Sequence, residues 1–268
     1  MKTVFKIVFH LVVIALLTAL TQIGGLLYGL ILLFYRPKER RLLKRSVVFA
    51  GLYMVLSLWA VPKTAAYFGR VELPHNEEIR AKIWAYRLLN RHYVTPEVKT
   101  QLEEVAQNLR ALEPEAAVVY LDANFPFVNG FPLLPHLSHD DGKKVDLAFF
   151  YRDEFGRLTN DKPSRSGYGV FESPRLGEFN QTEVCLNSGN KLYDKASFLT
   201  LGVPNPQLTF DAEFNRKFLQ LLSNNPETEK IFIEPHLKHR MNMGSSKIRF
   251  HGCQAVRHDD HIHWQTRN

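Results

Sequence analysis

The segment HLSHDDGKKVDLAFFY, residues 136–151, joins a short run rich in histidine and aspartate to a run with the alternation of a β-strand. On such a strand Val145 and Leu147 share one face, whereas Asp146 and Ala148 share the other. An ionised carboxylate on a buried strand is costly unless a cation or strong hydrogen bonds compensate it. The segment therefore predicts a core strand whose carboxylate has a partner.

A second histidine-rich segment, HDDHIHWQTRN, occupies residues 258–268. His261 and His263 are two residues apart, so on a strand both imidazoles point to the same side. If this strand lies beside the strand of Asp146, then Asp146 and His263 face a common centre, and His139 reaches it from the preceding loop. Three ligands of the types His, Asp and His leave a fourth position open, as in catalytic zinc sites. The two segments together predict a zinc centre.

Both segments resemble motifs of the penicillin-insensitive murein endopeptidases. The first motif is matched by His136, Ser138, His139, Gly142, Val145 and Asp146, and the H-x-x-H-x-H motif by His258, His261 and His263. The resemblance covers about residues 115–268. It extends to a superfamily that joins lysostaphin-type peptidases, D-alanyl-D-alanine metallopeptidases and hedgehog-like domains around one zinc site on a small antiparallel sheet.

The resemblance implies a role for each histidine of the two motifs. The zinc ligands would be His139, Asp146 and His263, and the catalytic residues would be His261, His258 and His136. Among these, His261 is expected to handle the proton of the attacking water, while His258 and His136 line the site. Asp260 is a rival for the acid–base role, because it resembles the acid–base position of the D-alanyl-D-alanine branch. On an ideal strand, however, it faces away from His263.

The expected activity is hydrolysis of a peptide bond in cell-wall peptidoglycan, with Zn²⁺ as cofactor and a peptidoglycan peptide as substrate. A D-Ala-D-Ala carboxypeptidase or dipeptidase, or a zinc-containing binding ectodomain without turnover, remains an alternative. The sequence HDD occurs at residues 139–141 and 258–260, which also raises a phosphohydrolase. Such His-Asp sites usually lie on helices, whereas these segments alternate as strands do. The bond that is cut and the oligomeric state stay open.

The N-terminal part has the composition of a membrane anchor. Residues 7–35 carry no formal charge and residues 46–61 form a second apolar run, whereas a membrane-spanning helix needs about 20 apolar residues. The first run is too long for the apolar core of a signal peptide. The loop at 36–45 has six basic residues and one acidic residue, which predicts a cytoplasmic loop. We therefore expect a multi-pass protein of the cell inner membrane, with both chain ends and the catalytic domain on the periplasmic side.

The net charge of +7 is concentrated in that loop, and no basic stripe with interleaved aromatic residues follows, so nucleic acid is not an expected partner. The sequence predicts an α+β protein in three regions: an anchor with two transmembrane helices (1–69), a helical connecting region (70–114) and a zinc metallopeptidase domain (115–268). This last domain is expected to have a small central antiparallel sheet flanked by helices. Helices are expected at 76–94, 96–112 and 210–225, and strands at 116–125, 143–153 and 230–235. Cys185 and Cys253 are expected to form a disulfide in an oxidising compartment.

Overall fold

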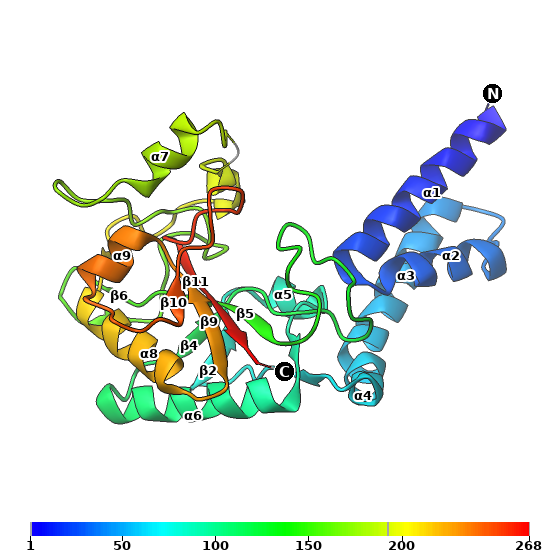
Figure 1. Ribbon diagram of the computed structural model, residues 1–268. Coiled ribbons are helices and arrows are strands. Elements are labelled where there is room, and N and C mark those ends of the chain that lie inside the picture. The colour runs from blue at the N-terminus through cyan, green and yellow to red at the C-terminus, as the bar shows by residue number, and fades with distance from the viewer. Residues whose placement is uncertain (1, 192, 268) are drawn as a thin grey trace.

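A computed structural model describes residues 2–191 and 193–267, and it has a helical projection attached to a mixed α+β domain (Figure 1). The α+β class is as predicted. The projection consists of α1 (Lys2–Thr21), α2 (Gly24–Phe34) and a continuous helical segment made of α3 (Arg41–Val55), the π-helical turn η1 (Leu56–Ala60), α4 (Val61–Ala65) and η2 (Ala66–Phe68). Two of these helical stretches, Thr3–Thr21 and Arg41–Phe68, are long and apolar enough to cross a membrane.

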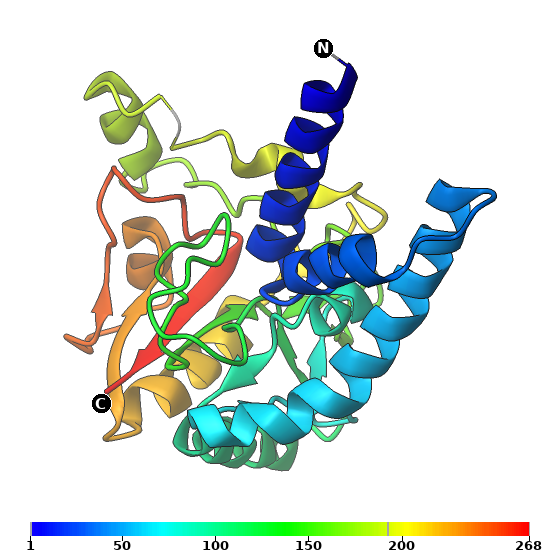
Figure 2. The ribbon, with the colours of Figure 1, turned by 90° about the vertical axis from the view of Figure 1, so that its right-hand side faces the viewer.

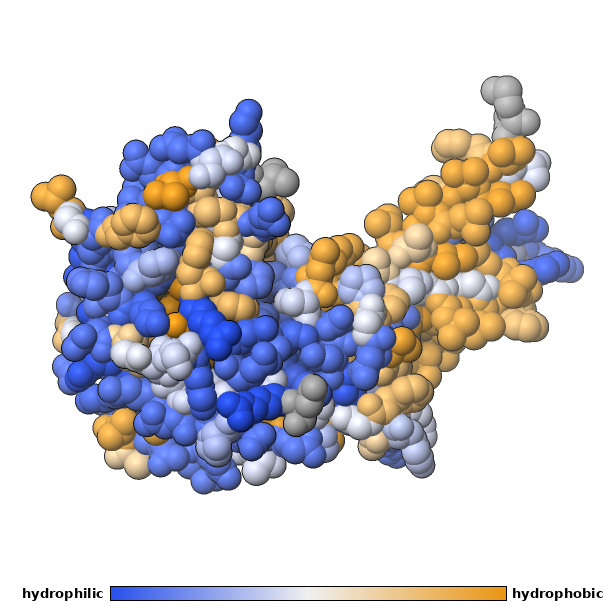
Figure 3. Space-filling model, viewed as in Figure 1, coloured by the Kyte–Doolittle hydropathy of each residue, from blue (hydrophilic) through white to orange (hydrophobic). Residues whose placement is uncertain are grey.

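The first apolar run differs from the expected single span, because it is broken after Thr21. Gln22 has a positive φ of 66°, and the chain reverses so that α2 packs back along α1, with His10 Nδ1 2.9 Å from the Tyr28 hydroxyl. The turn lies against the α+β domain, where Asn90 Nδ2 donates to the Thr21 carbonyl at 3.3 Å. Figure 2 shows the turn between α1 and α2 beside the domain, with α2 running across the lower end of α1. The surface of this projection is largely apolar, with the basic loop at its outer side (Figure 3).

The main sheet has six strands in the order β10-β9-β11-β5-β4-β2. The strands are β2 (Ile79–Ala81), β4 (Val118–Tyr120), β5 (Lys144–Ala148), β9 (Thr228–Phe232), β10 (Ile248–Arg249) and β11 (His261–Thr266). The four central strands, β9, β11, β5 and β4, pair antiparallel with one another. The two edge strands pair in parallel, β10 with β9 and β2 with β4. The expectation of a small antiparallel sheet is therefore wrong, because two short edge segments extend the antiparallel centre into a mixed sheet.

Two helices cover one face of this sheet, α6 (Pro96–Leu112) and α8 (Ala212–Asn224) (Figure 1). Each begins at a side-chain cap, with Thr95 accepting from the Val98 amide and Asp211 accepting from the Phe214 amide. Leu147 and Trp264, both 0% exposed, belong to the same apolar core as the buried faces of these helices. Because side chains alternate along a strand, Asp146 and His263 must lie on the opposite face of the sheet. That face is covered mainly by loops.

The helix expected at 76–94 is wrong. Residues of this stretch form β2, the short helix α5 (Trp84–Leu88) and β3 (Tyr93–Val94), which pairs with β1 (Val71–Glu72). The Asn76 side chain accepts from the amides of Glu78 and Ile79, and this local turn leads the chain into the sheet instead of a helix. The helices expected at 96–112 and 210–225 are confirmed as α6 and α8. The strands expected at 116–125, 143–153 and 230–235 are confirmed in part by β4, β5 and β9.

The remaining elements surround the loop-covered face. They are the three-stranded sheet of β6 (Tyr151–Arg152), β7 (Leu158–Thr159) and β8 (Thr209–Phe210), together with α7 (Gln181–Asn187), η3 (Ala196–Thr200) and α9 (Pro235–Arg240). A disulfide joins Cys185 of α7 to Cys253, with their Cα atoms 5.1 Å apart. The predicted cysteine pair is thus confirmed. It ties α7 to the loop that precedes β11.

Candidate metal centre

The centre is built on the pairing of β5 with β11. The register sets His263 opposite Asp146 and His261 opposite Ala148, so the two predicted strands are indeed neighbours. Trp264 fixes β11 from the other face, where its indole Nε1 donates to Thr228 Oγ1 at 2.8 Å. This register is the reason that two residues 117 positions apart in the sequence face each other.

Three potential ligand atoms of the predicted set converge on the loop-covered face. Asp146 Oδ1 lies 2.9 Å from His263 Nδ1 and 3.2 Å from His139 Nε2, and these two nitrogens are 3.1 Å apart. Asp146 and His139 are 0% exposed and His263 is 5% exposed. Zinc bound at about 2.0–2.1 Å by a tetrahedral set has ligand atoms roughly 3.3 Å from one another. The observed triangle is close to that size, so the three residues fit a zinc ion.

The orientation of His139 supports the same fit. Its Nδ1 lies 2.7 Å from the carbonyl oxygen of Ala123, to which it donates. In the neutral imidazole, Nε2 is then left with a lone pair directed at Asp146 and His263. Metal-binding histidines are usually held in this way by a hydrogen bond from the other ring nitrogen. Burial lowers the pKa of His263 to about 4, so this imidazole is also neutral, as a ligand must be.

A second grouping shares two of these residues. His136, His139 and Asp146 are buried and have ligand atoms close enough to hold a metal ion. His136 Nδ1 lies 2.9 Å from Asp146 Oδ2 and 3.4 Å from Asp122 Oδ2. Burial opposes a charge on His136, but the two carboxylates outweigh it and raise its pKa to about 10. His263 Nδ1 and His139 Nε2 both face Asp146 Oδ1, whereas His136 Nδ1 lies beside the other oxygen of Asp146, and this geometry favours His263 as the third ligand.

Two groups beneath the centre were not identified from the sequence, Asp122 and Arg91. The Arg91 guanidinium binds Asp122 through two hydrogen bonds, Nε to Oδ1 at 2.6 Å and a terminal nitrogen to Oδ2 at 2.8 Å. Burial opposes the charge on Asp122, but Arg91 and His136 outweigh it and lower its pKa to about 2. Asp122 in turn contacts His136. An arginine thus supports the centre through a carboxylate and a histidine.

Tyr168 is a third group that sequence reasoning missed. Its hydroxyl donates to Asp146 Oδ2 at 2.8 Å, the carboxylate oxygen that does not face His139 and His263. Tyr168 lies between two glycines of positive φ, Gly167 at 94° and Gly169 at 80°. A Cβ on Gly167 would come within 2.3 Å of the Leu121 side chain, so this close approach requires glycine. The sequence SGYG in a long loop is the signal, but it carries no periodicity that points to the site.

His261 lies across the centre from His139. Its Nε2 is 3.7 Å from Asp146 Oδ2, while its Nδ1 is hydrogen-bonded to Asp260 Oδ1. The other oxygen of Asp260 accepts from the Gly169 amide at 2.6 Å. Burial opposes a charge on His261, but Asp260 and Asp146 outweigh it and raise its pKa. Both oxygens of Asp260 are therefore engaged away from the centre, whereas the free nitrogen of His261 faces it.

His258 lies among other histidines, with ring centroids 4.9 Å from His261 and 5.4 Å from His251. Burial, together with the charge of His261, lowers its pKa well below the usual range, and no described group hydrogen-bonds to its buried Nδ1. Its backbone amide donates to Glu234 Oε1 at 3.1 Å, and that oxygen also accepts from the Tyr193 hydroxyl at 2.6 Å. Burial raises the pKa of Glu234 to about 7. His258 is thus a neutral imidazole held in place by its backbone.

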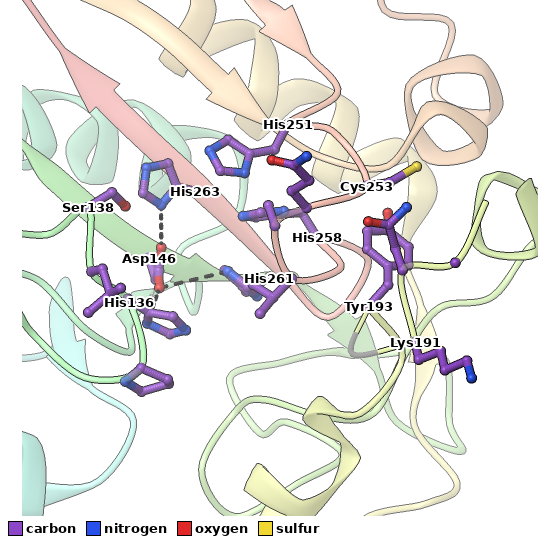
Figure 4. A pocket seen from close by; sticks show the side chains of 17 residues that line it. His136, Ser138, Asp146, Lys191, Tyr193, His251, Cys253, His258, His261 and His263 are labelled. Atoms are coloured by element: carbon purple, nitrogen blue, oxygen red, sulfur yellow. Dashed lines mark hydrogen bonds and ion pairs between the residues drawn. The ribbon is translucent and has the colours of Figure 1, made fainter. Parts of the chain in front are cut away.

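A pocket of about 760 Å³ opens onto the centre (Figure 4). Every residue predicted for the site lines it except His139, which is fully buried. One wall is the segment 135–138 before His139. The opposite wall consists of residues 189–191, Tyr193, His251 and residues 253–256, and the Cys185–Cys253 disulfide ties the last of these to α7. The centre is therefore at the bottom of a cavity with room for a peptide-sized group.

No family model matches the sequence, and no curated protein matches it.

Proposed function

We propose that this chain is a membrane-anchored zinc metallopeptidase that hydrolyses peptide bonds of cell-wall peptidoglycan. The observation that carries the proposal is the triangle of His139 Nε2, Asp146 Oδ1 and His263 Nδ1, with sides of 2.9–3.2 Å, at the bottom of the pocket. His139, Asp146 and His263 would hold the ion. Zinc bound by three such residues activates water and polarises a carbonyl group.

His261 would accept the proton of the attacking water at Nε2 and return it to the leaving amine. Its Nδ1 bond to Asp260 fixes the ring and stabilises the imidazolium that forms on proton transfer, as the carboxylate partner of a catalytic histidine generally does. Asp260 is then a positioning residue, because its oxygens are held by His261 and Gly169. This assigns the acid–base role to His261 and not to Asp260.

His136 and His258 would contact the substrate from two sides of the pocket. His136 carries a proton between Asp122 and Asp146, and so it can stabilise negative charge that develops on the substrate carbonyl. His258 is neutral and buried, with one ring nitrogen unpaired. It is suited to a hydrogen bond with a peptide group of the substrate, since an unpaired buried polar atom costs free energy until it finds a partner.

The substrate class rests on the resemblance of both histidine motifs to those of the murein endopeptidases. The apolar projection is compatible with it, because an anchored domain outside the cytoplasm works next to the cell wall. The basic loop at its outer side supports that orientation, since Lys and Arg loops stay in the cytoplasm. A periplasmic domain also agrees with the disulfide.

The test is turnover of purified murein sacculi by the full chain in detergent, with the released fragments identified by mass. We expect new peptide ends to appear, to vanish with a chelator and to return with about one equivalent of zinc. The His261→Ala variant should cleave the same sacculi about 10² or more times slower, and a variant of a histidine remote from the pocket, His239→Ala, should keep full activity. Zinc binding without any new peptide ends would instead identify a non-catalytic binding domain.

A further inference from the structure

We propose that the pocket-rim loop, residues 126–138, rests on the surface of the lipid bilayer beside the anchor, so that the pocket opens next to the membrane. The loop carries three large aliphatic side chains that are exposed on the domain: Val128 at 57%, Leu134 at 47% and Leu137 at 59%. Such a cluster of exposed apolar side chains on one loop is typical of a surface that another apolar phase covers.

The loop is continuous with the anchor. The Phe127 amide donates to Gln22 Oε1 at 3.1 Å, and Gln22 is the residue at which the apolar hairpin of α1 and α2 turns. The ring of the same residue, Phe127, packs edge-on against Phe68, with ring centroids 5.1 Å apart. Phe68 is the last residue of the helical segment Arg41–Phe68. The loop therefore starts beside the turn of the hairpin and the last residue of the segment Arg41–Phe68.

The two ribbon views agree with this arrangement. In both, the loop between β4 and β5 lies beside the base of α1 (Figures 1 and 2). In the space-filling view, apolar surface on the domain lies between the hollow of the domain and the apolar projection (Figure 3). A bilayer that surrounds the projection would thus lie close to this loop.

The pocket-rim loop also forms part of the entrance through which a substrate reaches the site. Pro135, Leu137 and Ser138 of this loop form one wall of the pocket, and the chain then continues directly into His139. If Leu134 and Val128 contact lipid, that wall stands at the membrane surface. The pocket then favours substrates attached to or lying on the membrane over those several nanometres away from it.

The experiment uses the full chain in lipid nanodiscs made of phosphatidylcholine and phosphatidylglycerol. Both native cysteines are in the disulfide, so one added cysteine gives a single site for a nitroxide spin label. The test variants are Val128→Cys and Leu134→Cys. Phe155→Cys, which replaces an exposed apolar residue of the β6–β7 turn (72%), is the matched control for water. Val12→Cys on α1 (51% exposed) is the control for lipid.

The measurement is the accessibility of each label to oxygen, which concentrates in lipid, and to a water-soluble nickel complex. We expect labels at residues 128 and 134 to resemble that at residue 12, with a ratio of oxygen to nickel accessibility at least threefold above that at residue 155. The melting temperature of each variant checks that it is folded, and the two test sites are independent substitutions. A ratio like that of residue 155 at either site in a folded variant, or an aqueous reading at residue 12, would overturn the proposal. Since no turnover is measured, the result is independent of the peptidase activity.

Discussion

His263 lies directly opposite Asp146 across the β5–β11 pair, with His263 Nδ1 2.9 Å from Asp146 Oδ1. The contact places two side chains from distant parts of the sequence on the face of the sheet opposite α6 and α8. His139 completes the set from the preceding loop. The arrangement explains why a buried carboxylate is tolerated on a core strand, because Asp146 is surrounded by groups that stabilise its charge.

The proposed acid–base role of His261 can be separated from metal binding by experiment. We expect His261→Ala to retain about one zinc while turnover falls by about 10² or more, as is typical for loss of a general base. The measurements are metal content and the rate of murein cleavage for the same preparation. The His239→Ala variant serves as the control. If turnover were unchanged in His261→Ala, the proton would have to pass through another residue, such as His258.

Tyr168 is expected to support the metal through Asp146. Its hydroxyl holds the oxygen of Asp146 that faces away from His139 and His263, and loss of such an outer partner typically weakens metal binding by about 10–100-fold. The Tyr168→Phe variant should show this loss in competition with a coloured chelator. Tyr86→Phe is the matched control, since its buried hydroxyl donates to the Ser166 carbonyl of the same loop at 3.0 Å. Equal zinc affinity in the two variants would exclude this role.

Glu234 is expected to make the free energy of unfolding depend on pH. Burial raises its pKa to about 7 in the folded protein, above its ordinary value of 4.5, so folding favours the protonated form. The protonated Glu234 therefore stabilises the folded protein by up to roughly 3 kcal/mol. This stabilisation is fully present below about pH 4.5 and is lost as the pH rises through about 7. The Glu234→Gln variant keeps an acceptor for the Tyr193 hydroxyl and should lose this dependence. Thermal unfolding of the unchanged protein and of the variant is measured between pH 5 and pH 8, at the same zinc content. If the two melting temperatures changed with pH in the same way, the prediction would be wrong.

The disulfide closes a loop between positions 68 apart in sequence, for which chain entropy gives roughly 4 kcal/mol of stabilisation as an upper figure. We expect alkylation of the denatured protein to modify no thiol before reduction and two afterwards, as read by mass. The Cys185→Ser, Cys253→Ser double variant should unfold at a lower temperature. Two reactive thiols in the unreduced protein would show that the pair does not form.

The orientation of the anchor can be mapped with cysteines added to a variant in which both native cysteines are serine. A membrane-impermeant maleimide applied to intact cells should label residue 176, in the exposed loop before α7, and should not label residue 41 in the basic loop, because of the charge bias of that loop. The α1–α2 hairpin adds a second expectation. Residue 3 should also be protected, since the hairpin turn lies at the domain, and this differs from the sequence expectation that both chain ends face outward. Labelling at residue 41 would reverse the orientation.

The sequence predicted those parts of the site that follow from local alternation. The faces of Asp146 and His263 could be assigned because side chains alternate along a strand with a period of two. A carboxylate and an imidazole can bind the same metal ion, and this suggested that the two strands are neighbours. The edge strands of the sheet could not be predicted, since Ile79–Ala81 lies in a stretch with helical spacing and its pairing partner is Val118–Tyr120. Arg91 and Tyr168 were missed for a related reason. Their contacts with Asp122 and Asp146 depend on how distant loops close over the sheet.

The most direct test of the zinc centre is the metal content of two single variants, His263→Ala and His136→Ala, purified in parallel with the unchanged full chain and measured by mass spectrometry of the metal. We predict about one zinc in the unchanged protein and in His136→Ala, and less than about one tenth of that in His263→Ala, because three ligands are needed for a stable site. The contradicting result is the reverse pattern, in which His263→Ala keeps its zinc and His136→Ala loses it.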